Sequence, residues 1–364
     1  MFATLTACLA LLTVSAYAAV FWFLEPPEVD RAPVQREALA APQLGDLQEM
    51  AEVDADGNIV FLPPVSPLAG DGWRPGVYTI LIAGEDDGFG GNDVIMVVLF
   101  DTHRGEVDVL SIPRDTIVNV PWGIKKLNSY QHLYRLLPEA HDHYIYALRD
   151  GVEKLIGYQT DFWITVDLDG FSALVDAIGG VDFYVPQRMV YSDPEQGLFI
   201  NLQPGVQRLT GQQAEGLVRF RTFPSGDIQR IQTQHAFLGA LADQLLSARG
   251  LLAIDDLLRT FRDHVETDLT LRNLAFFATE FLRMDHSNIR FHSVDAQTAN
   301  IADHVNGISY VSLFVEPWVE LLNRYMNPFT WEIRAGDLEI LTRDPVTGQF
   351  FTTNGAPWTN NWVR

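Results

Sequence analysis

The sequence is poor in cations and almost without cysteine. Lys and Arg number 25 against 47 Asp and Glu, so the formal net charge at pH 7 is −22. Nucleic acid is held mainly by clustered Lys and Arg, and this balance therefore argues against a nucleic-acid partner. The single cysteine, Cys8, lies in an apolar run. That count excludes an intrachain disulfide and a Cys-x-x-Cys metal or redox site.

Two common catalytic signatures are also missing. The sequence contains neither a Gly-x-Ser-x-Gly nucleophile elbow nor a His-Glu-x-x-His zinc helix. His141 and His143 lie two residues apart, but the sequence places no third ligand beside them. A surface helix or loop explains this pair better than a zinc site does.

The N-terminal segment has no charged residue between positions 2 and 24. As a helix it would span about 34 Å, which is enough to cross a bilayer. A cleaved signal peptide is the alternative, because residues 15–18 offer an Ala-x-Ala site. The apolar run continues past that site, however, and residues 21–23 (FWF) resemble an interfacial belt. We therefore expect residues 1–24 to be a retained single-pass anchor of the cell membrane, with the main domain extracytoplasmic.

Residues 25–74 are rich in Pro, Ala and acidic residues, a composition typical of an extended linker. Within it, residues 54–58 (DADGN) begin like a calcium loop. The glycine comes two positions early, however, and position twelve is Val65 instead of Glu. A plain turn is the better interpretation.

From about residue 77 the sequence alternates between strand and helix patterns. β-Branched runs bounded by Gly and Asp predict strands, and apolar residues at three- and four-residue spacing predict helices. The expected strands are 78–84, 94–100, 106–112 and 162–168; the expected helices are 127–137 and 144–156, and residues 171–185 run from helix into strand. This order predicts an α/β fold with a mixed central β-sheet and helices on both faces.

The second half is mostly helical in pattern. Helices are expected at 227–248, 251–264, 271–284 and 309–325, with residues 288–294 returning to the sheet. Residues 327–364 alternate apolar and polar residues around Gly and Asn. This C-terminal extension either adds strands or a hairpin or is a loosely attached tail. Residues 75–326 are then the main domain.

Cations gather locally in residues 216–234. In LVRFR the apolar and basic residues alternate, which predicts a strand with Arg219 and Arg221 on one face. Asp227, Arg230 and Gln234 follow at helical spacing and share one face of a helix. These cations would suit a compact anion such as pyrophosphate. The alternative is that Asp227 caps the helix and pairs with an arginine at the surface.

Two further segments carry charges at strand ends. Residues 84–93 (GEDDGFGGND) form a Gly-rich acidic loop between two expected strands, and ligands of open α/β sheets bind at the carboxyl ends of strands. Carboxylates there suit Mg²⁺ or Mn²⁺, whereas a solvated acidic turn is the alternative. Residues 111–115 (SIPRD) end a strand, and Pro113 forces Arg114 out of the ladder.

The order of these motifs resembles the LytR-CpsA-Psr family of membrane-anchored cell-envelope proteins. The matching segments are Gly-x-Asp at residues 84–86, Asn-Asp before an apolar strand, VLSIPRDT, KLN, DLDGFSALVDAIGGVDFYVP, LTGQQAEGLVRFR and GDIQRIQTQ. The likeness covers residues 77–246 motif by motif and is looser to about residue 325. Seven motifs in one order are specific, although any one of them alone would not be.

The resemblance implies transfer of a glycopolymer from an undecaprenyl-pyrophosphate carrier to a cell-wall acceptor, typically peptidoglycan, with Mg²⁺ at the pyrophosphate. It implies these roles: Asp86 and Asp93 hold the metal; Arg114, Arg219, Arg221 and Arg230 bind pyrophosphate; Gln234, Asp227 and Lys126 add polar contacts, with Asn128 in the same motif as Lys126. Either aspartate would be the general base. An apolar tunnel for the prenyl tail could be lined by residues 171–178 and 235–246, although aliphatic helix faces are more often core.

The sequence departs from the family pattern in the same segments. Gly91 and Thr233 stand where members commonly carry Arg, and Gln229 stands where a glycine is usual. The lost guanidinium at position 91 removes one expected phosphate contact. A non-catalytic polyprenyl-pyrophosphate-binding protein, or one with only pyrophosphatase-like activity, is therefore the alternative function.

Overall fold

A computed structural model gives the fold of the protein. The structure describes residues 51–53, 59–61, 72–85, 92–120, 122–130, 144–194, 197–220, 222–223, 227–245, 264–344, 346–360 and 362. The expected N-terminal anchor and the DADGN turn lie outside these residues, as does the expected helix at 251–264 except for its last residue. Within the described part, no helix is long and apolar enough to cross a membrane. Of the linker, β1 (Ala51–Val53) pairs antiparallel with β2 (Ile59–Phe61).

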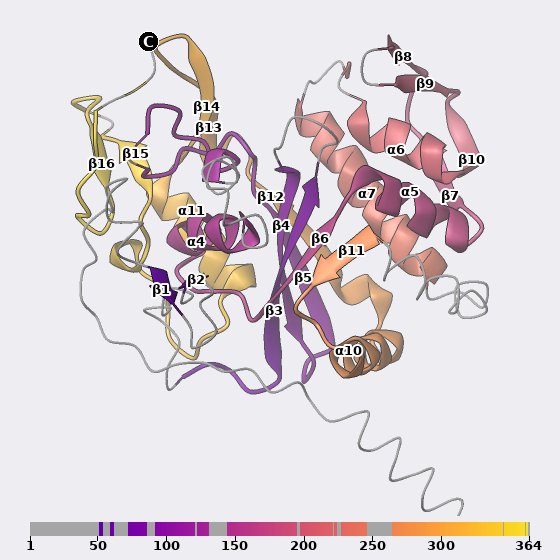
Figure 1. Ribbon diagram of the computed structural model, residues 1–364, viewed down its shortest axis with the longest axis horizontal. Coiled ribbons are helices and arrows are strands. Elements are labelled where there is room, and N and C mark those ends of the chain that lie inside the picture. Colours follow the sequence, from indigo (N-terminus) through magenta and orange to yellow (C-terminus); the bar gives the residue numbers. More distant parts are fainter. Residues whose placement is uncertain are drawn as a thin grey trace, which may run out of the picture.

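A six-stranded sheet forms the centre of the molecule, in the order β11-β6-β3-β4-β5-β12 (Figure 1). Its strands are β3 (Val77–Glu85), β4 (Asn92–Asp101), β5 (Glu106–Ser111), β6 (Phe162–Val166), β11 (Val265–Thr267) and β12 (Ile289–Ser293). β3 runs parallel to β6 and β5 runs parallel to β12, whereas β4 and β11 are antiparallel to their neighbours. The expected mixed sheet is confirmed, including the return of residues 288–294.

Alternate residues of each strand point to opposite faces of this sheet, and apolar residues on both faces are buried. Ile95, Val97 and Leu99 of β4 join one hydrophobic cluster, and Met96 and Phe100 join another. The first cluster packs against α4 (Tyr144–Ile156) and α11 (Val315–Leu321), and the second against α10 (Leu271–Arg283). Helices on both faces are therefore confirmed, and α4 has the bounds expected from the sequence.

A second group of elements packs beside the sheet and has its own core (Figure 1). It consists of α5 (Leu168–Ala177), β7 (Val181–Val185), β8 (Met189–Asp193), β9 (Leu198–Leu202), β10 (Gly205–Leu209), α6 (Gly211–Arg219) and α7 (Asp227–Leu245). β7 pairs with β10, and β8 pairs with β9. Phe171 and Phe237 contact each other in this core, with ring centroids 5.9 Å apart, and Val175 and Leu241 join them. The helices considered for a prenyl tunnel thus pack as core.

Two expectations from local pattern are wrong. The LVRFR segment does not form a strand, because α6 continues through Arg219. Thr210 and Gln213 form a capping box that starts this helix. Residues 309–325 are not one helix. Their first part is β14 (Ile308–Leu313), which pairs with β13 (Ala299–Val305), and α11 begins only at Val315 before a π-helical turn, η2 (Leu322–Met326).

The C-terminal extension is packed into the domain, so the loosely attached tail is excluded. Its strands β15 (Leu341–Arg343) and β16 (Phe350–Thr352) form a hairpin, and a short 3₁₀ turn precedes them at Ala335–Asp337. A second 3₁₀ turn, His286–Asn288, lies before β12 in the main domain. Leu338 and Ile340 are fully buried in the main cluster. Phe329 of the extension packs edge-on against Trp73, which lies near the start of the described domain in the sequence, with ring centroids 5.3 Å apart.

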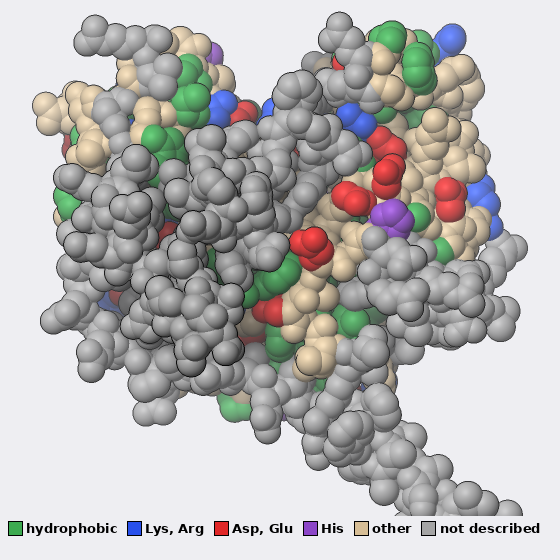
Figure 2. All heavy atoms as spheres, in the orientation of Figure 1, with side chains coloured by type: hydrophobic (Ala, Val, Ile, Leu, Met, Phe, Trp, Pro, Cys, Tyr) green, Lys and Arg blue, Asp and Glu red, His purple; other side chains and the backbone are tan. Residues whose placement is uncertain are grey.

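Acidic side chains form a run on the coloured part of this face. Figure 2 shows Asp and Glu along its middle, with Lys and Arg at the upper end of that run and towards the rim. This distribution agrees with the net charge of −22.

Truncation of a buried extension residue tests this packing. We expect Leu338→Ala to lower the free energy of unfolding by about 2–5 kcal/mol, because it removes buried methyl groups and leaves a cavity. Val346→Ala is the control, since Val346 is 91% exposed and surface changes cost little. Urea denaturation followed by circular dichroism measures both. Equal stability of the two variants would contradict the packed extension.

Candidate functional site

A cavity of about 310 Å³ opens at one edge of the central sheet. At this edge β3, β5, β6 and β12 end and β4 begins, as follows from their directions. In Figure 1 these strand ends lie between α7 on one side and the β13–β14 hairpin on the other. The cavity is lined by residues of these elements: Asp93, Val94, Ile95, Met96, Ser111, Ile112, Pro113, Arg114, Asp115, Arg230, Ile231, Gln234, Ile301, Ser309 and Val311. It lies where open α/β sheets bind ligands.

The end of β5 is fixed by Pro113. The amide of Ile112 still donates to Ile95 O (2.9 Å), but a proline has no N–H to continue the ladder. The chain then turns, and Thr116 donates to Pro113 O from both its backbone amide (3.0 Å) and its hydroxyl (2.7 Å). This turn presents Arg114 and Asp115 at the cavity, as the sequence predicted for Arg114.

Asp93 and Arg114 are brought together at the cavity. A guanidinium nitrogen of Arg114 forms an ion pair with the Asp93 carboxylate, and their side chains remain 33% and 30% exposed. Asp93 was expected as a metal ligand and Arg114 as a pyrophosphate-binding cation. The structure therefore joins two groups that the sequence could only place at separate strand ends.

The KLN segment, residues 126–128, contacts the turn that carries Arg114 and Asp115. Lys126 Nζ lies 2.9 Å from Asp115 Oδ1, and the Asn128 amide donates to Arg114 O at 3.1 Å. Lys126 also lies over the ring of Tyr310, 5.5 Å from its centroid. Lys126 is not among the residues that line the cavity. Its contacts fix the shape of the Arg114 turn.

Helix α7 supplies the opposite wall. Arg230 and Gln234 both line the cavity, which agrees with the helical face expected for them. Gln234 Nε2 donates to Val218 O at 2.8 Å and so ties α7 to the end of α6. Thr233 is buried, and its hydroxyl donates to Gln229 O at 2.8 Å. This position, where family members commonly carry Arg, therefore faces away from the cavity.

The other expected site residues are not all placed there. Arg219 ends α6 and pairs with Glu215 one turn earlier (2.7 Å), and it does not line the cavity. Asp86 and Arg221 lie outside the described residues. Asp227 begins α7, as expected for a helix start, but its side chain is not described. The predicted convergence of Arg219 with Arg230 thus has no support from the cavity.

Two polar residues of the site were missed from the sequence. Ser111 Oγ lies 2.7 Å from His235 Nε2, and Ser111 lines the cavity. The imidazole of His235 stacks on Phe291, with centroids 5.2 Å apart and planes at 28°. Burial, and secondly the nearby His292, lower the pKa of His235 to about 4. Ser111 belongs to the SIPRD motif and His235 follows Gln234, but no local pattern pairs them.

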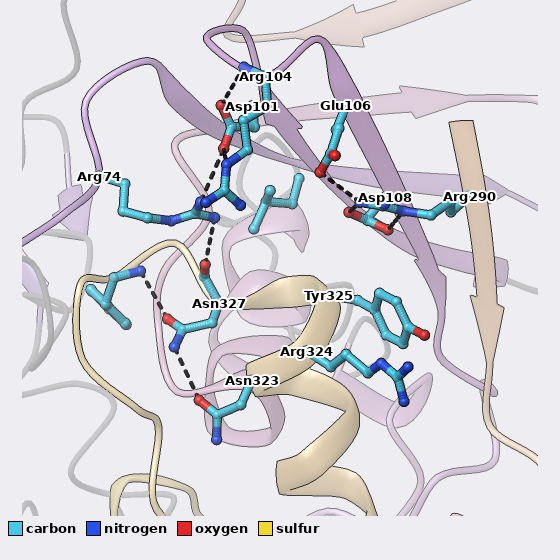
Figure 3. Close-up of a pocket in the computed structure, with 12 residues that line it drawn as sticks. Arg74, Asp101, Arg104, Glu106, Asp108, Arg290, Asn323, Arg324, Tyr325 and Asn327 are labelled. Atoms are coloured by element: carbon cyan, nitrogen blue, oxygen red, sulfur yellow. Dashed lines mark hydrogen bonds and ion pairs between the residues drawn. The ribbon is translucent and has the colours of Figure 1, made fainter. Parts of the chain in front are cut away.

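A second cavity, of about 220 Å³, lies at the opposite edge of the sheet (Figure 3). It contains four arginines and three carboxylates, and the carboxylates are all engaged. Asp101 pairs with Arg74 at 3.0 Å and with Arg104 at 3.7 Å, and Arg290 pairs with Glu106 at 2.9 Å and with Asp108 at 2.7 Å.

These ion pairs hold strands together instead of facing a ligand. Burial pushes the pKa of Asp108 up, but hydrogen bonds from His292 and Arg290 outweigh it and hold the pKa below its usual value. We interpret this cavity as a structural network that joins β4, β5, β12 and η2.

A divalent cation fits the donor set of the first cavity only in part. Mg²⁺ usually takes one or two protein carboxylates and completes its shell with water and phosphate oxygens. Asp93 provides one such carboxylate beside two cavity arginines that would hold phosphate. Within the described ranges, no group of three or more His, Cys, Asp or Glu is placed to hold a metal.

Known proteins share this sequence pattern. Probable cell wall biosynthesis protein LcpB of Corynebacterium glutamicum is 37% identical over 170 residues, or 46% of this chain and 38% of that protein. Regulatory protein MsrR of Staphylococcus aureus is 28% identical over 200 residues, or 53% of this chain and 57% of that protein. The chain thus spans roughly two to three fifths of the length of these curated relatives.

Solved structures share the fold. TagV of B. subtilis superimposes with a TM-score of 0.57 at 23% identity, over 70% of this chain and 98% of that one. A structure titled "TagT bound to LI-WTA" superimposes with a TM-score of 0.53 at 19% identity, over 71% and 92%. The model of the LytR_cpsA_psr family matches residues 71–323, which is well over half of the chain. The protein therefore belongs to the LytR-CpsA-Psr family.

Proposed function

We propose that the protein is a membrane-anchored glycopolymer transferase. It moves a glycan from an undecaprenyl-pyrophosphate carrier to a cell-wall acceptor such as peptidoglycan. Family membership supports this proposal, as do a relative named for cell wall biosynthesis and a fold shared with TagT, which was solved with LI-WTA. The single observation that carries it is the cavity in which Asp93 and Arg114 meet opposite Arg230 and Gln234.

The cavity offers the groups that a pyrophosphate requires. Arg114 and Arg230 come from two different elements, the turn after β5 and helix α7, and line the same space. Guanidinium groups bind phosphate oxygens bidentately, so two of them on opposite walls would orient both phosphates. Gln234 adds an amide that α6 holds in place. Transfer of a phosphoryl group asks a protein mainly for such positioning and positive charge.

The reaction has a simple balance. An acceptor hydroxyl attacks the phosphorus bonded to the sugar and forms a new P–O bond, while the bridging P–O bond breaks and undecaprenyl phosphate leaves. The hydroxyl proton passes to a carboxylate, for which Asp93 and Asp86 are the candidates. Mg²⁺ or Mn²⁺, held by the same aspartates, would neutralise charge on the phosphate oxygens. Apolar residues of the cavity, Ile301 and Val311 of the hairpin, would contact the first part of the prenyl chain.

The location of the reaction follows from the N-terminal sequence. Residues 2–24 would anchor the chain in the cell membrane, and the domain would lie on its extracytoplasmic side. The lipid carrier and the cell-wall acceptor are both available there.

A second candidate is a binding protein that retains polyprenyl pyrophosphate without turnover. Gly91 favours it, because this residue stands where family members commonly carry Arg and supplies no guanidinium. The two candidates share the pyrophosphate site and differ only in the release of undecaprenyl phosphate.

The cavity arginines can be tested by substitution in the full-length protein in detergent. We expect Arg114→Ala and Arg230→Ala each to weaken binding of a polyprenyl pyrophosphate at least tenfold, because a hydrogen bond between charged groups contributes about 1.5–3 kcal/mol. Arg208→Ala is the control, since Arg208 pairs with Asp182 on the exposed β7–β10 pair. Isothermal titration calorimetry gives the affinities. Wild-type affinity in both cavity variants would refute the site.

Metal removal tests the reaction itself. We expect EDTA to abolish release of undecaprenyl phosphate from a lipid-linked oligosaccharide in the presence of peptidoglycan, and Mg²⁺ or Mn²⁺ to restore it. Asp93→Asn should raise the Mg²⁺ concentration needed, since an amide is a weaker ligand than a carboxylate. Mass spectrometry of the lipid products measures release. Binding without release in the wild type would support the second candidate, and release in EDTA would contradict the metal.

A further inference from the structure

The Ser111–His235 contact joins the two walls of the cavity. Ser111 is the last residue of β5 and lies three positions before Arg114, and His235 follows Gln234 on α7. Their side chains thus meet between the two segments that supply the cavity arginines. Neither residue belongs to the set of ligands that the family resemblance implies.

The imidazole of His235 is held by two contacts. It stacks on Phe291 of β12, and its Nε2 lies 2.7 Å from Ser111 Oγ of β5. His292, the next residue of β12, is the titratable group that acts on it from that strand, and His292 Nε2 lies 2.7 Å from Asp108 Oδ1. His235 therefore has one orientation in which to meet the hydroxyl.

The hydroxyl keeps capacity for a second partner. A serine has one donor and two acceptor positions, and the contact with His235 occupies only one of them. Because Ser111 also lines the cavity, its remaining positions are within reach of a ligand bound there. A fixed hydroxyl beside guanidinium groups suits a phosphate oxygen, which accepts hydrogen bonds.

A proton-relay role fits less well. An efficient general base has a pKa near the working pH. Burial lowers the pKa of His235 to about 4, so the imidazole is neutral near pH 7 but accepts a proton poorly. A neutral imidazole can still donate a hydrogen bond from Nε2 to Ser111 Oγ. The hydroxyl proton of Ser111 then points away from the imidazole and is free to be donated to another group.

We propose that Ser111 contacts the substrate by donating a hydrogen bond to a phosphate oxygen of the bound pyrophosphate, and that His235 is the positioning residue that orients its hydroxyl. The identity of this ligand rests on the proposed function. The inference adds a neutral donor to the cations of the cavity, where a side chain of β5 meets one of α7.

The protonation state of His235 can be checked through stability. Unfolded histidine has a pKa near 6.5, so between pH 6.5 and about 4 the unfolded chain binds a proton at this residue that the folded chain does not. Stability contributed by the neutral imidazole is therefore present above pH 6.5 and is lost as the pH falls towards 4. We expect the wild type to lose stability relative to His235→Gln over this range, as measured by urea unfolding at several pH values. A constant difference would mean that His235 titrates normally.

The proposal is tested with three substitutions in the full-length protein in detergent. Ser111→Ala removes the hydroxyl, His235→Phe keeps a ring over Phe291 but removes the hydrogen bond, and His235→Gln keeps a polar group at the reach of Nε2. We expect Ser111→Ala and His235→Phe each to weaken binding of inorganic pyrophosphate about tenfold by calorimetry, and His235→Gln to stay within about threefold of the wild type.

The double variant Ser111→Ala/His235→Phe separates positioning from a merely structural role. If His235 acts through the hydroxyl, the double variant binds no more weakly than Ser111→Ala alone. Between pH 6 and 8 the affinity of the wild type and that of His235→Gln should change in parallel, because His235 stays neutral there and the pyrophosphate titrates alike in both measurements. Additive losses, or an affinity for pyrophosphate unchanged by Ser111→Ala, would overturn the inference, as would a wild type that binds no pyrophosphate.

The same experiment distinguishes this inference from the proposed function. A wild type that binds pyrophosphate through Ser111 but releases no undecaprenyl phosphate would refute the transferase and leave the inference standing. A wild type that transfers normally, with Ser111→Ala indistinguishable from it in pyrophosphate affinity and in the KM for the lipid substrate, would refute the inference alone.

Discussion

The candidate site depends on the antiparallel register of β4 and β5. In this register Met96 lies opposite Ser111, the last residue of β5. Asp93 stands three residues before Met96, and Arg114 stands three residues after Ser111, so both extend beyond the last pair at the same edge. Pro113 prevents the ladder from continuing and turns Arg114 towards its neighbour. One strand pairing thus brings a carboxylate and a guanidinium that are 21 residues apart in the chain into contact.

The sequence predicted elements whose cause is local. β3, β4, β5 and β6 are β-branched runs, and α4 carries apolar residues at helical spacing, so pattern predicted their positions, whereas the short edge strand β11 was not expected. The motifs indicated that Asp93 and Arg114 lie at strand ends near a ligand, and the register of β4 and β5 places both residues at the cavity. The order of motifs identified the family, which the match over residues 71–323 confirms.

The failures have an equally physical cause. The alternation in LVRFR fits a strand, but four residues before Arg219 stands Glu215, and their pairing at 2.7 Å extends the helix that Thr210 begins. Residues 309–313 also have helical spacing, yet pairing with β13 satisfies their backbone instead. Contacts within the helix decided the first case, and hairpin pairing decided the second. The meeting of Ser111 with His235 is of a different kind, because it is a long-range contact that depends on how α7 packs against β12.

A neutral, half-buried histidine at this place sets a conflict between stability and function. Burial disfavours the charged imidazole, so the folded protein is weakened wherever the unfolded chain gains a proton at this position. A leucine in the same place would pack on Phe291 without that cost, but it could not hold the Ser111 hydroxyl. His292, the residue after Phe291 on β12, shows the contrast, because its Nε2 lies 2.7 Å from the Asp108 carboxylate and it serves to join strands. An uncompensated imidazole beside a ligand cavity is therefore better explained by what it orients than by what it stabilises.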